Sequence, residues 1–415
     1  MTSTHDDVTT ATTFASLGID PSLVTLLTDD EIVDPFPIQE MTIPEVLAGR
    51  DVCGRAKTGS GKTLAFGLPI IQRLTPARSK RPLALILVPT RELANQVTEV
   101  LRPLARARGF SLVAVYGGVS MKNQIDRLEG GVEIVVATPG RLIDLMERKK
   151  VRFDDVSMVC IDEADQMADM GFLPQVRRIM RQVPDDRQTM LFSATLDGQV
   201  GSLIRDYMED PVEHGVDAPT ETIETMEHRF LKVHQMDKVK LAAAIANSAT
   251  RTLMFVRTKY ACDRVARALR DHGVAAKAIH GDLDQSKRET ALASFADGTT
   301  PVLVATNVAA RGLHIDNVDI VVHYDPPDDP KTYLHRSGRT ARAGESGLVV
   351  TLVEWDQVNE VIGIQRRAGL NVPIVKMFSN DARLTDLASW EPPRDLAPFD
   401  GDARRRPGSP RRRRR

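Results

Sequence analysis

The chain has 415 residues, enough for two or three domains with well-buried cores. Hydrophobic residues make up 42% and charged residues 27%, as in ordinary soluble proteins, and no apolar run reaches the roughly 18 residues of a membrane span. We therefore expect no membrane-spanning helix and no membrane partner, and the polar, acidic N-terminus leads us to expect no secretory signal.

The three cysteines, Cys53, Cys160 and Cys262, lie far apart and lack the spacing of metal ligands. We expect reduced thiols in a cytoplasmic protein, a packing role for Cys160, and no metal site built from thiolates.

The net charge of −1 conceals an uneven distribution. Residues 404–415 carry eight arginines and no acid, so the rest of the chain has a net charge of −9. An acidic body does not hold nucleic acid by its overall charge, so such a ligand must bind at a localised surface. The arginine-rich tail would add a sequence-independent, salt-sensitive attraction, and a role in solubility alone is the alternative.

Apolar runs of strand length alternate with helical patterns in the first half of the chain. Strands are expected at 51–53, 82–88, 111–116, 132–137, 156–161 and 189–192. A helix is expected at 64–74 and another begins at 89–93. Continuous apolar strands that alternate with helices indicate a parallel sheet covered on both faces.

Prolines and a glycine among acidic residues then predict a linker, followed by a second series of the same kind. Its strands are expected at 252–256, 275–279, 302–305, 320–324 and 347–353. The predicted fold class is α/β, with two tandem domains that are each a parallel sheet flanked by helices. The boundaries are a disordered N-terminus at 1–13, domains at 14–210 and 226–377, a linker at 211–225, and a disordered arginine-rich tail at 378–415.

One glycine-rich segment has the pattern of a phosphate-binding loop that opens a helix. It consists of Ala56, Lys57, Thr58, Gly59, Ser60, Gly61, Lys62 and Thr63, with alanine where the first glycine is usual. Backbone N–H groups of such a loop surround phosphate, and the helix dipole adds to the attraction. Lys62 would reach the outer phosphates and the Thr63 hydroxyl would hold Mg²⁺. A chance glycine-rich turn is the alternative for this segment alone.

An acidic run follows the predicted strand at 156–161, about 100 residues after the loop. Asp162 at the strand end is placed to hold Mg²⁺, partly through water, and Glu163 to orient and deprotonate an attacking water. A solvated helix cap is the alternative for this run when it is taken by itself.

With its Asp-Glu-Ala-Asp run at 162–165, the chain resembles the DEAD-box RNA helicases of helicase superfamily 2, and among them the bacterial type. The resemblance covers roughly residues 14–375, with the family's motifs in the family's order. It implies two RecA-like domains, ATP and Mg²⁺ as cofactors, RNA as the partner, and hydrolysis of ATP. It implies a monomer that holds the RNA backbone with little sequence specificity.

The resemblance assigns the adenine-recognising segment to 35–39, with Phe14 upstream. Gln39 can donate and accept hydrogen bonds at once, which suits the edge of adenine. Ile32 stands where the family usually has an aromatic residue that stacks on adenine, so we expect weak nucleotide affinity. A core role for Ile32 is the alternative.

In the first domain, the resemblance implies RNA-backbone contacts and a coupling element. The RNA contacts are Arg91, Gly118, Thr138 and Arg141. Ser193 and Thr195 would couple the ATP state to RNA opening through Asp165, with helix capping as the alternative for Ser193.

In the second domain, the residues that match RNA positions are Phe255, Thr258, Gly281, Gln285, Arg288 and Thr306. Gly312 and His314 match nucleotide contacts, although Asn307 and His314 replace aspartates that the family usually carries. His335 matches a coupling position. Arg339 and Arg342 would stabilise charge on the γ-phosphate as arginine fingers, with a surface basic helix as the alternative.

The sequence leaves the physiological role open. An ATP-controlled RNA clamp or assembly factor without useful unwinding is the main rival to a helicase, and a DNA-translocating motor is a third possibility that the acidic run and Gln39 oppose. Ribosome assembly, RNA decay and cold adaptation, with the corresponding ribosomal or RNA-decay complexes, are all compatible with the resemblance.

Overall fold

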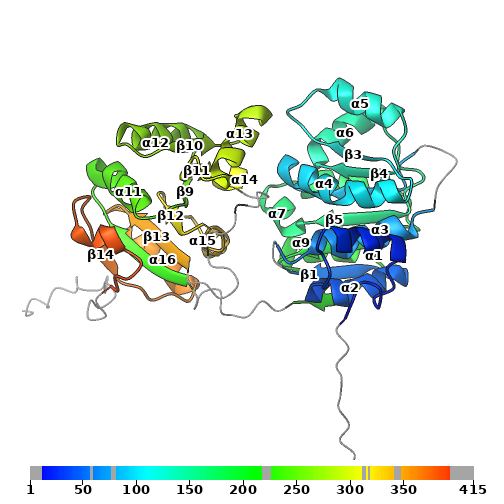
Figure 1. Cartoon of the computed structure of the whole chain (residues 1–415), viewed down its shortest axis with the longest axis horizontal. Coiled ribbons are helices and arrows are strands. Elements are labelled where there is room, and N and C mark those ends of the chain that lie inside the picture. The colour runs from blue at the N-terminus through cyan, green and yellow to red at the C-terminus, as the bar shows by residue number, and fades with distance from the viewer. Residues whose placement is uncertain are drawn as a thin grey trace, which may run out of the picture. The chain divides into compact units, whose positions relative to one another are not determined.

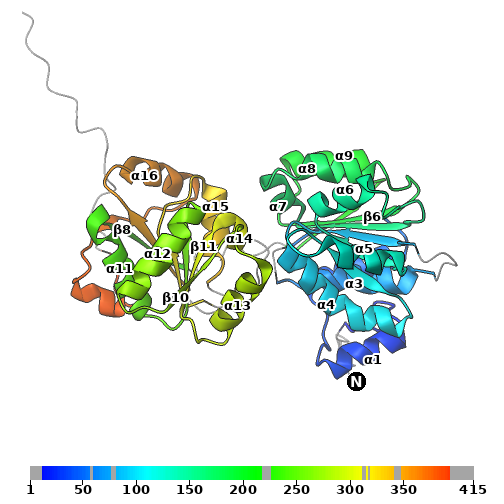
Figure 2. The ribbon, with the colours of Figure 1, turned by 90° about the horizontal axis from the view of Figure 1, so that it is seen from above.

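The computed structural model describes residues 12–56, 59–75, 81–216, 226–310, 315, 318–340 and 347–392 (Figure 1). The chain divides into two compact units, the first ending at residue 218 and the second beginning at residue 219. Each unit contains one sheet with helices packed on it, as Figure 2 shows for each unit from a second direction.

The first unit has a seven-stranded sheet in the order β3-β4-β2-β5-β6-β1-β7, and every pairing is parallel. The strands are β1 (Val52–Arg55), β2 (Ala84–Leu87), β3 (Leu112–Val115), β4 (Ile134–Ala137), β5 (Met158–Asp162), β6 (Gln188–Ser193) and β7 (Val212–Gly215). Strand β7 lies in the stretch that the sequence assigns to the linker, and it pairs with β1 at the sheet edge. Its side chains alternate between half-buried and exposed, so it lacks the apolar run by which the other strands are recognised.

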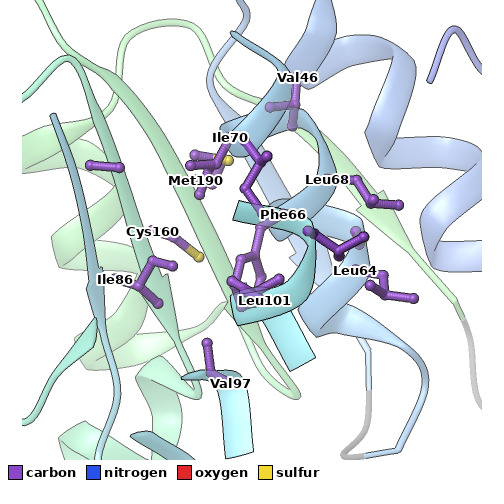
Figure 3. Close-up of a cluster of buried hydrophobic side chains, with 14 of the residues drawn as sticks. Val46, Leu64, Phe66, Leu68, Ile70, Ile86, Val97, Leu101, Cys160 and Met190 are labelled. Carbon is purple, nitrogen blue, oxygen red and sulfur yellow. The ribbon is translucent and has the colours of Figure 1, made fainter. Parts of the chain in front are cut away.

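Helices cover both faces of this sheet and create two cores. The helices are α1 (Pro21–Asp29), α2 (Pro37–Leu47), α3 (Lys62–Arg73), α4 (Arg91–Ala107), α5 (Met121–Glu129), α6 (Pro139–Glu147), α7 (Ala164–Asp169), α8 (Leu173–Met180) and α9 (Gly198–Tyr207). Strand β2 illustrates the division, because Ile86 points into the core beneath α3 and α4 while Leu85 points into the opposite core. In Figure 3 Phe66 of α3 and Leu101 of α4 lie together in the first of these cores, which fixes the helix that follows the glycine-rich loop.

The second unit also has a seven-stranded parallel sheet, in the order β10-β11-β9-β12-β13-β8-β14. Its strands are β8 (Met226–Lys232), β9 (Thr252–Val256), β10 (Ala276–Ile279), β11 (Val302–Thr306), β12 (Ile320–His323), β13 (Gly347–Val353) and β14 (Ile374–Lys376). Its helices are η1 (Gln235–Asp237), α11 (Lys238–Asn247), α12 (Lys259–Asp271), α13 (Gln285–Ala296), α14 (Asn307–Ala310), α15 (Pro330–Ser337), α16 (Val358–Arg367) and η2 (Ala382–Asp386). The two parallel sheets confirm the predicted fold class.

The sequence predicts disorder after residue 377, but the chain is packed against the second unit as far as residue 392. Leu384 and Leu387 are buried in the core of the second unit, at 4% and 1% exposure. The Trp390 ring lies under the guanidinium groups of Arg229 and Arg383, at 5.9 and 5.0 Å. The apolar residues here are too sparse and too irregular for a sequence pattern, and only tertiary packing orders them. The remaining tail, with its arginines, lies outside the described residues.

Two further expectations concern the whole chain. All three cysteines are free and buried, and burial raises the pKa of the Cys53 and Cys262 thiols to about 12. None of the helices in the described ranges is long and apolar enough to cross a membrane.

Candidate functional site

The carboxyl ends of β5, β6 and β1 lie side by side along the carboxyl-terminal edge of the first sheet. Asp162 is in register with Phe192 of β6, and Ser193 is in register with Arg55 of β1. The glycine-rich loop leaves β1 and the acidic run leaves β5 at this edge, where open α/β sheets bind their ligands. Ala56 N donates a hydrogen bond to Ser193 O at 3.0 Å and fastens the start of the loop to β6.

The described part of the loop has the backbone that phosphate binding requires. Gly59 and Gly61 have φ values of 84° and 81°, in the left-handed region that favours glycine. Gly61 is the N-cap of α3, so the helix begins at Lys62. Lys57 and Thr58 lie outside the described residues. The amino end of α3 therefore directs its unpaired N–H groups and its positive dipole end toward this edge.

Lys62 and Asp162 form the centre of the site. Lys62 is 7% exposed, and its Nζ lies 4.0 Å from Oδ1 of Asp162, which is 2% exposed. Burial raises the pKa of Asp162 to about 7, Lys62 opposes this rise, and Glu163 adds to it. A buried carboxylate of this kind gains from an additional cation, and Thr63, the second residue of α3, carries a hydroxyl oxygen. These oxygen donors fit Mg²⁺, which needs few protein ligands when phosphates and waters supply the rest.

Glu163 has an unusual backbone. Its φ of 52° and ψ of 49° lie in the left-handed region, which costs a non-glycine residue about 1–3 kcal/mol. Its N–H donates a hydrogen bond of 2.9 Å to Asp162 Oδ1, which helps to hold this conformation. The strained turn places the two carboxylates at the end of one strand, buried together at the sheet edge.

Ser193 connects the acidic run to the end of β6. Its Oγ accepts a hydrogen bond from the backbone N–H of Asp165 at 3.2 Å and donates one to Thr195 O at 2.7 Å. The hydroxyl thus contacts the first turn of α7 from a neighbouring strand, whereas the N-cap residues of α7 and α9 are Glu163 and Asp197, so Ser193 is the N-cap of neither helix. The link runs through the Asp165 backbone.

The residues expected around adenine have different environments. Gln39 is 1% exposed; its Nε2 donates to Gly61 O at 2.9 Å and its Oε1 accepts from Phe36 N at 2.8 Å. Ile32 is half-buried against the core, in line with its core alternative. Phe14 is 2% exposed within that core, so in this structure it supports the site from beneath and presents no face to a ligand.

The four RNA positions expected in the first unit follow β2, β3 and β4. The Arg91 guanidinium lies against Gly118, whose φ of 84° is in the left-handed region that favours glycine. Arg141 Nη1 donates to Val119 O at 3.3 Å, which brings α6 to the loop after β3. Thr138 is the N-cap of α6. The structure thus brings two guanidinium groups, a hydroxyl and helix N-termini to one edge, as backbone phosphates require.

In the second unit, β10, β11 and β9 are neighbours, and the expected RNA positions follow their carboxyl ends. Thr258 caps α12 by accepting from Ala261 N at 3.1 Å. Thr306 ends β11, and Gly281 follows β10. Gln285 and Arg288 lie in the first turn of α13 and are 9% and 5% exposed.

Phe255 does not reach this surface. It is 2% exposed, and the guanidinium of Arg336 lies 5.2 Å above its ring. Arg336 also donates from Nε to Asn307 Oδ1 at 2.6 Å and from Nη1 to the Asp325 carbonyl at 2.9 Å. No role is predicted for Arg336 from the sequence. Arg336 is 4% exposed and connects three elements. The sequence shows only an arginine beside His335 in a basic motif, which does not indicate burial or these contacts.

Other expected residues are only partly placed. His335 and Arg339 are half-buried at and just after the end of α15. Gly312, His314 and Arg342 lie outside the described residues.

Comparisons with known proteins agree with this arrangement. Residues 36–203 match the family described as DEAD/DEAH box helicase, and residues 232–344 match the helicase conserved C-terminal domain. The ATP-dependent RNA helicase CshA of Listeria monocytogenes is 41% identical over 345 residues, which cover 83% of this chain and 66% of that protein. The DEAD-box ATP-dependent RNA helicase CshA of Streptococcus pneumoniae is 42% identical over 391 residues, which cover 92% and 74%.

A solved structure, S. cerevisiae Dbp5 bound to RNA and ADP BeF3, aligns with a TM-score of 0.76 and 30% identity, covering 89% of this chain and 97% of that chain. Two RecA-like domains, the first with a glycine-rich loop beside an acidic run, define the two-domain class of nucleotide-driven helicases. Within that class, this chain belongs to the DEAD-box helicase family, and its curated relatives include bacterial members.

Proposed function

We propose that the chain is an ATP-dependent RNA helicase that hydrolyses ATP to ADP and phosphate and uses the reaction to open short RNA duplexes or to remodel ribonucleoprotein. The observation that carries the proposal is the pairing of Lys62, at the start of α3, with the buried Asp162 at 4.0 Å. Because 4.0 Å exceeds hydrogen-bonding distance, the ammonium group can still donate to phosphate.

In the proposed reaction, the backbone N–H groups of the loop and Lys62 bind the β- and γ-phosphates. Mg²⁺ held by the Thr63 hydroxyl and, through water, by Asp162 would neutralise phosphate charge. Glu163 orients a water molecule and takes its proton as the water oxygen bonds to the γ-phosphorus. The bond to the bridging oxygen breaks, and its electron pair leaves with ADP.

The second unit would supply Arg339 and Arg342 to the developing charge on the γ-phosphate. The RNA positions would contact phosphates and 2′-hydroxyl groups, which favours RNA over DNA and gives little sequence selectivity. Because each unit would carry part of both sites, ATP and RNA would each promote binding of the other.

Strand separation tests this proposal against the RNA clamp. The substrate is a short RNA duplex with a single-stranded extension, and the Glu163→Gln variant is the matched control because it keeps the shape of the side chain and removes the base. The proposal expects ATP-dependent strand release by the unaltered protein and none by the variant. ATP turnover that RNA stimulates without any strand release would favour the clamp.

The finer expectations also belong to this proposal. Three free, buried thiols fit a reducing, cytoplasmic compartment. A monomer that joins ribosomal or RNA-decay complexes remains our expectation for the assembly.

A further inference from the structure

Neither Phe14 nor Ile32, two of the residues expected near adenine, offers an exposed aromatic face. Phe14 is 2% exposed and Ile32 packs half-buried against the same core. A third aromatic residue nearby, Phe36, is 53% exposed. In the described part of the first unit, Phe36 is the one aromatic side chain in the exposed class.

Phe36 is held at the edge of the glycine-rich loop. It is the N-cap of α2, and its N–H donates to Gln39 Oε1 at 2.8 Å. A Cβ atom on Gly61 would overlap both the Phe36 ring at Cδ2 and the Gln39 amide at Nε2. The ring edge, the amide and the loop therefore meet at one point, while 53% of the residue is exposed to solvent.

The Gln39 amide retains capacity for a ligand beside this ring. A glutamine amide has two donor hydrogens and two acceptor lone pairs. The bonds to Gly61 O and Phe36 N use one of each. One donor and one acceptor of the amide are not used by these two bonds, and the edge of adenine requires such a pair. Gln39 is 1% exposed in the free protein, so the base reaches this pair only if the Phe36 ring beside it moves to cover a face of the base.

We propose that Phe36 supplies the stacking face for the adenine base in this chain, in place of the aliphatic Ile32. Gln39 then reads the edge of the base while the loop holds the phosphates. This inference rests on the proposed ATP-dependent function. It replaces the expectation of weak nucleotide affinity, because stacking is provided from a different position.

The test measures binding of ADP and ATP with Mg²⁺ to the intact chain by calorimetry. Phe36→Leu keeps an apolar side chain of similar size without a π face, and Phe36→Tyr keeps the face. We expect Phe36→Leu to weaken binding about tenfold, from the usual size of base–aromatic stacking, and Phe36→Tyr to bind as the unaltered protein. Phe36→Leu with unchanged affinity would overturn the inference.

Two controls separate base contact from damage to the loop. Inorganic tripolyphosphate with Mg²⁺ should inhibit ATP turnover by competing for the phosphate site. Its inhibition constant should be the same for the Phe36→Leu variant and the unaltered protein, because this probe has no base. A parallel loss of tripolyphosphate inhibition would show that Phe36 supports the loop, which contradicts the inference. Ile32→Phe added to Phe36→Leu should recover ADP binding by restoring an aromatic face at the family's usual position.

Measuring nucleotide binding tests the role of Phe36 separately from the proposed function. If RNA fails to stimulate ATP turnover by the unaltered protein, the proposed function fails. The affinities of the Phe36 variants for ADP still decide the role of Phe36.

Discussion

The two units share one strand topology but differ in the charged groups around a corresponding buried lysine. Counted from the first strand of each unit, both sheets have the order 3-4-2-5-6-1-7. In both, the first α-helix after the first strand begins with a buried lysine near an aspartate that lies at or just after the end of the fifth strand. Lys62 is 4.0 Å from Asp162 in the first unit, and Lys238 is 3.2 Å from Asp325 in the second.

The surroundings of the two lysines differ. Lys238 also bonds Glu354 at 2.8 Å and lies 4.6 Å above the ring of Tyr324, so two carboxylates already neutralise its charge. No glycine-rich loop precedes it, and η1 occupies that position. The shared topology places a buried lysine at the same point of both sheets. The glycine-rich loop and the longer separation of Lys62 from its carboxylate are the features on which the proposed phosphate site depends.

Replacing Lys62 should have the largest effect on activity. Lys62→Met removes the cation proposed to contact the transferring phosphate, and we expect RNA-stimulated ATP turnover to fall by about 10²–10³-fold. Steady-state phosphate release measures this loss. The unfolding transition should stay close to that of the unaltered protein, because burial already raises the pKa of Asp162 to about 7 and its carboxylate can take up a proton when Lys62 is lost. Turnover above about one tenth of the original value would contradict a catalytic role.

Replacing Lys238 should instead reduce stability. Lys238→Met leaves two largely buried carboxylates without their shared cation, which costs about 3 kcal/mol of unfolding free energy. Trp355 and Trp390 are the two tryptophans of the chain and both lie in the second unit, so tryptophan fluorescence during urea unfolding reports on this unit alone. Turnover per folded molecule should change little. A large loss of turnover in a stably folded variant would break the distinction between the two lysines.

The second unit should also lose stability in acid. His323 is fully buried, and burial, with Arg336 and His228 nearby, lowers its pKa well below the usual 6.5. Below pH 6.5 the unfolded chain binds a proton at this position that the folded chain does not, so stability falls as the pH falls. His323 contributes at most about 1.4 kcal/mol of unfolding free energy per pH unit to this loss.

The variant His323→Asn provides the control for this pH dependence. Asparagine can retain the bond to Thr351 Oγ1, which His323 Nδ1 makes at 3.1 Å, and it does not titrate. Urea unfolding between pH 5 and 7, followed by tryptophan fluorescence, should give a smaller pH slope for this variant. Equal slopes would assign the acid sensitivity to other groups.

The smallest effect is expected from the arginine-rich tail. Deleting residues 404–415 removes eight positive charges that would release counterions from RNA. We expect weaker RNA binding with a flatter dependence on salt, and a maximal ATP turnover close to that of the full chain. Fluorescence anisotropy of labelled single-stranded RNA at several salt concentrations measures the slope. An unchanged slope would favour the solubility alternative.

Much of this architecture could be predicted from the sequence, because apolar runs and helical periodicity are local features of the chain. The apolar runs before the loop and before the acidic run indicated that both motifs follow the ends of strands, and both sheets confirm the parallel α/β class. Strand β7 was missed because an edge strand needs only half of its side chains buried. The packing of Leu384 and Leu387 was missed because isolated apolar residues have no period.

The parts of the site that the sequence did not reveal depend on contacts between distant residues. Asn307 and Arg336 are 29 positions apart, and Lys238 and Glu354 are 116 apart. Phe36 lies in the segment that the resemblance assigns to adenine, but no stacking role was predicted for it because that role depends on exposure, which the sequence does not give. Its position against Gly61 follows from the packing of α2 beside α3.

The most direct test of the central claim is steady-state ATP turnover by the intact protein, with and without single-stranded RNA and with single-stranded DNA of the same sequence. Glu163→Gln supplies the background for every condition. The proposed helicase should turn over ATP much faster with RNA than alone, and DNA should stimulate it far less. Turnover that RNA leaves unchanged, in a protein that still binds both ligands, would contradict the account.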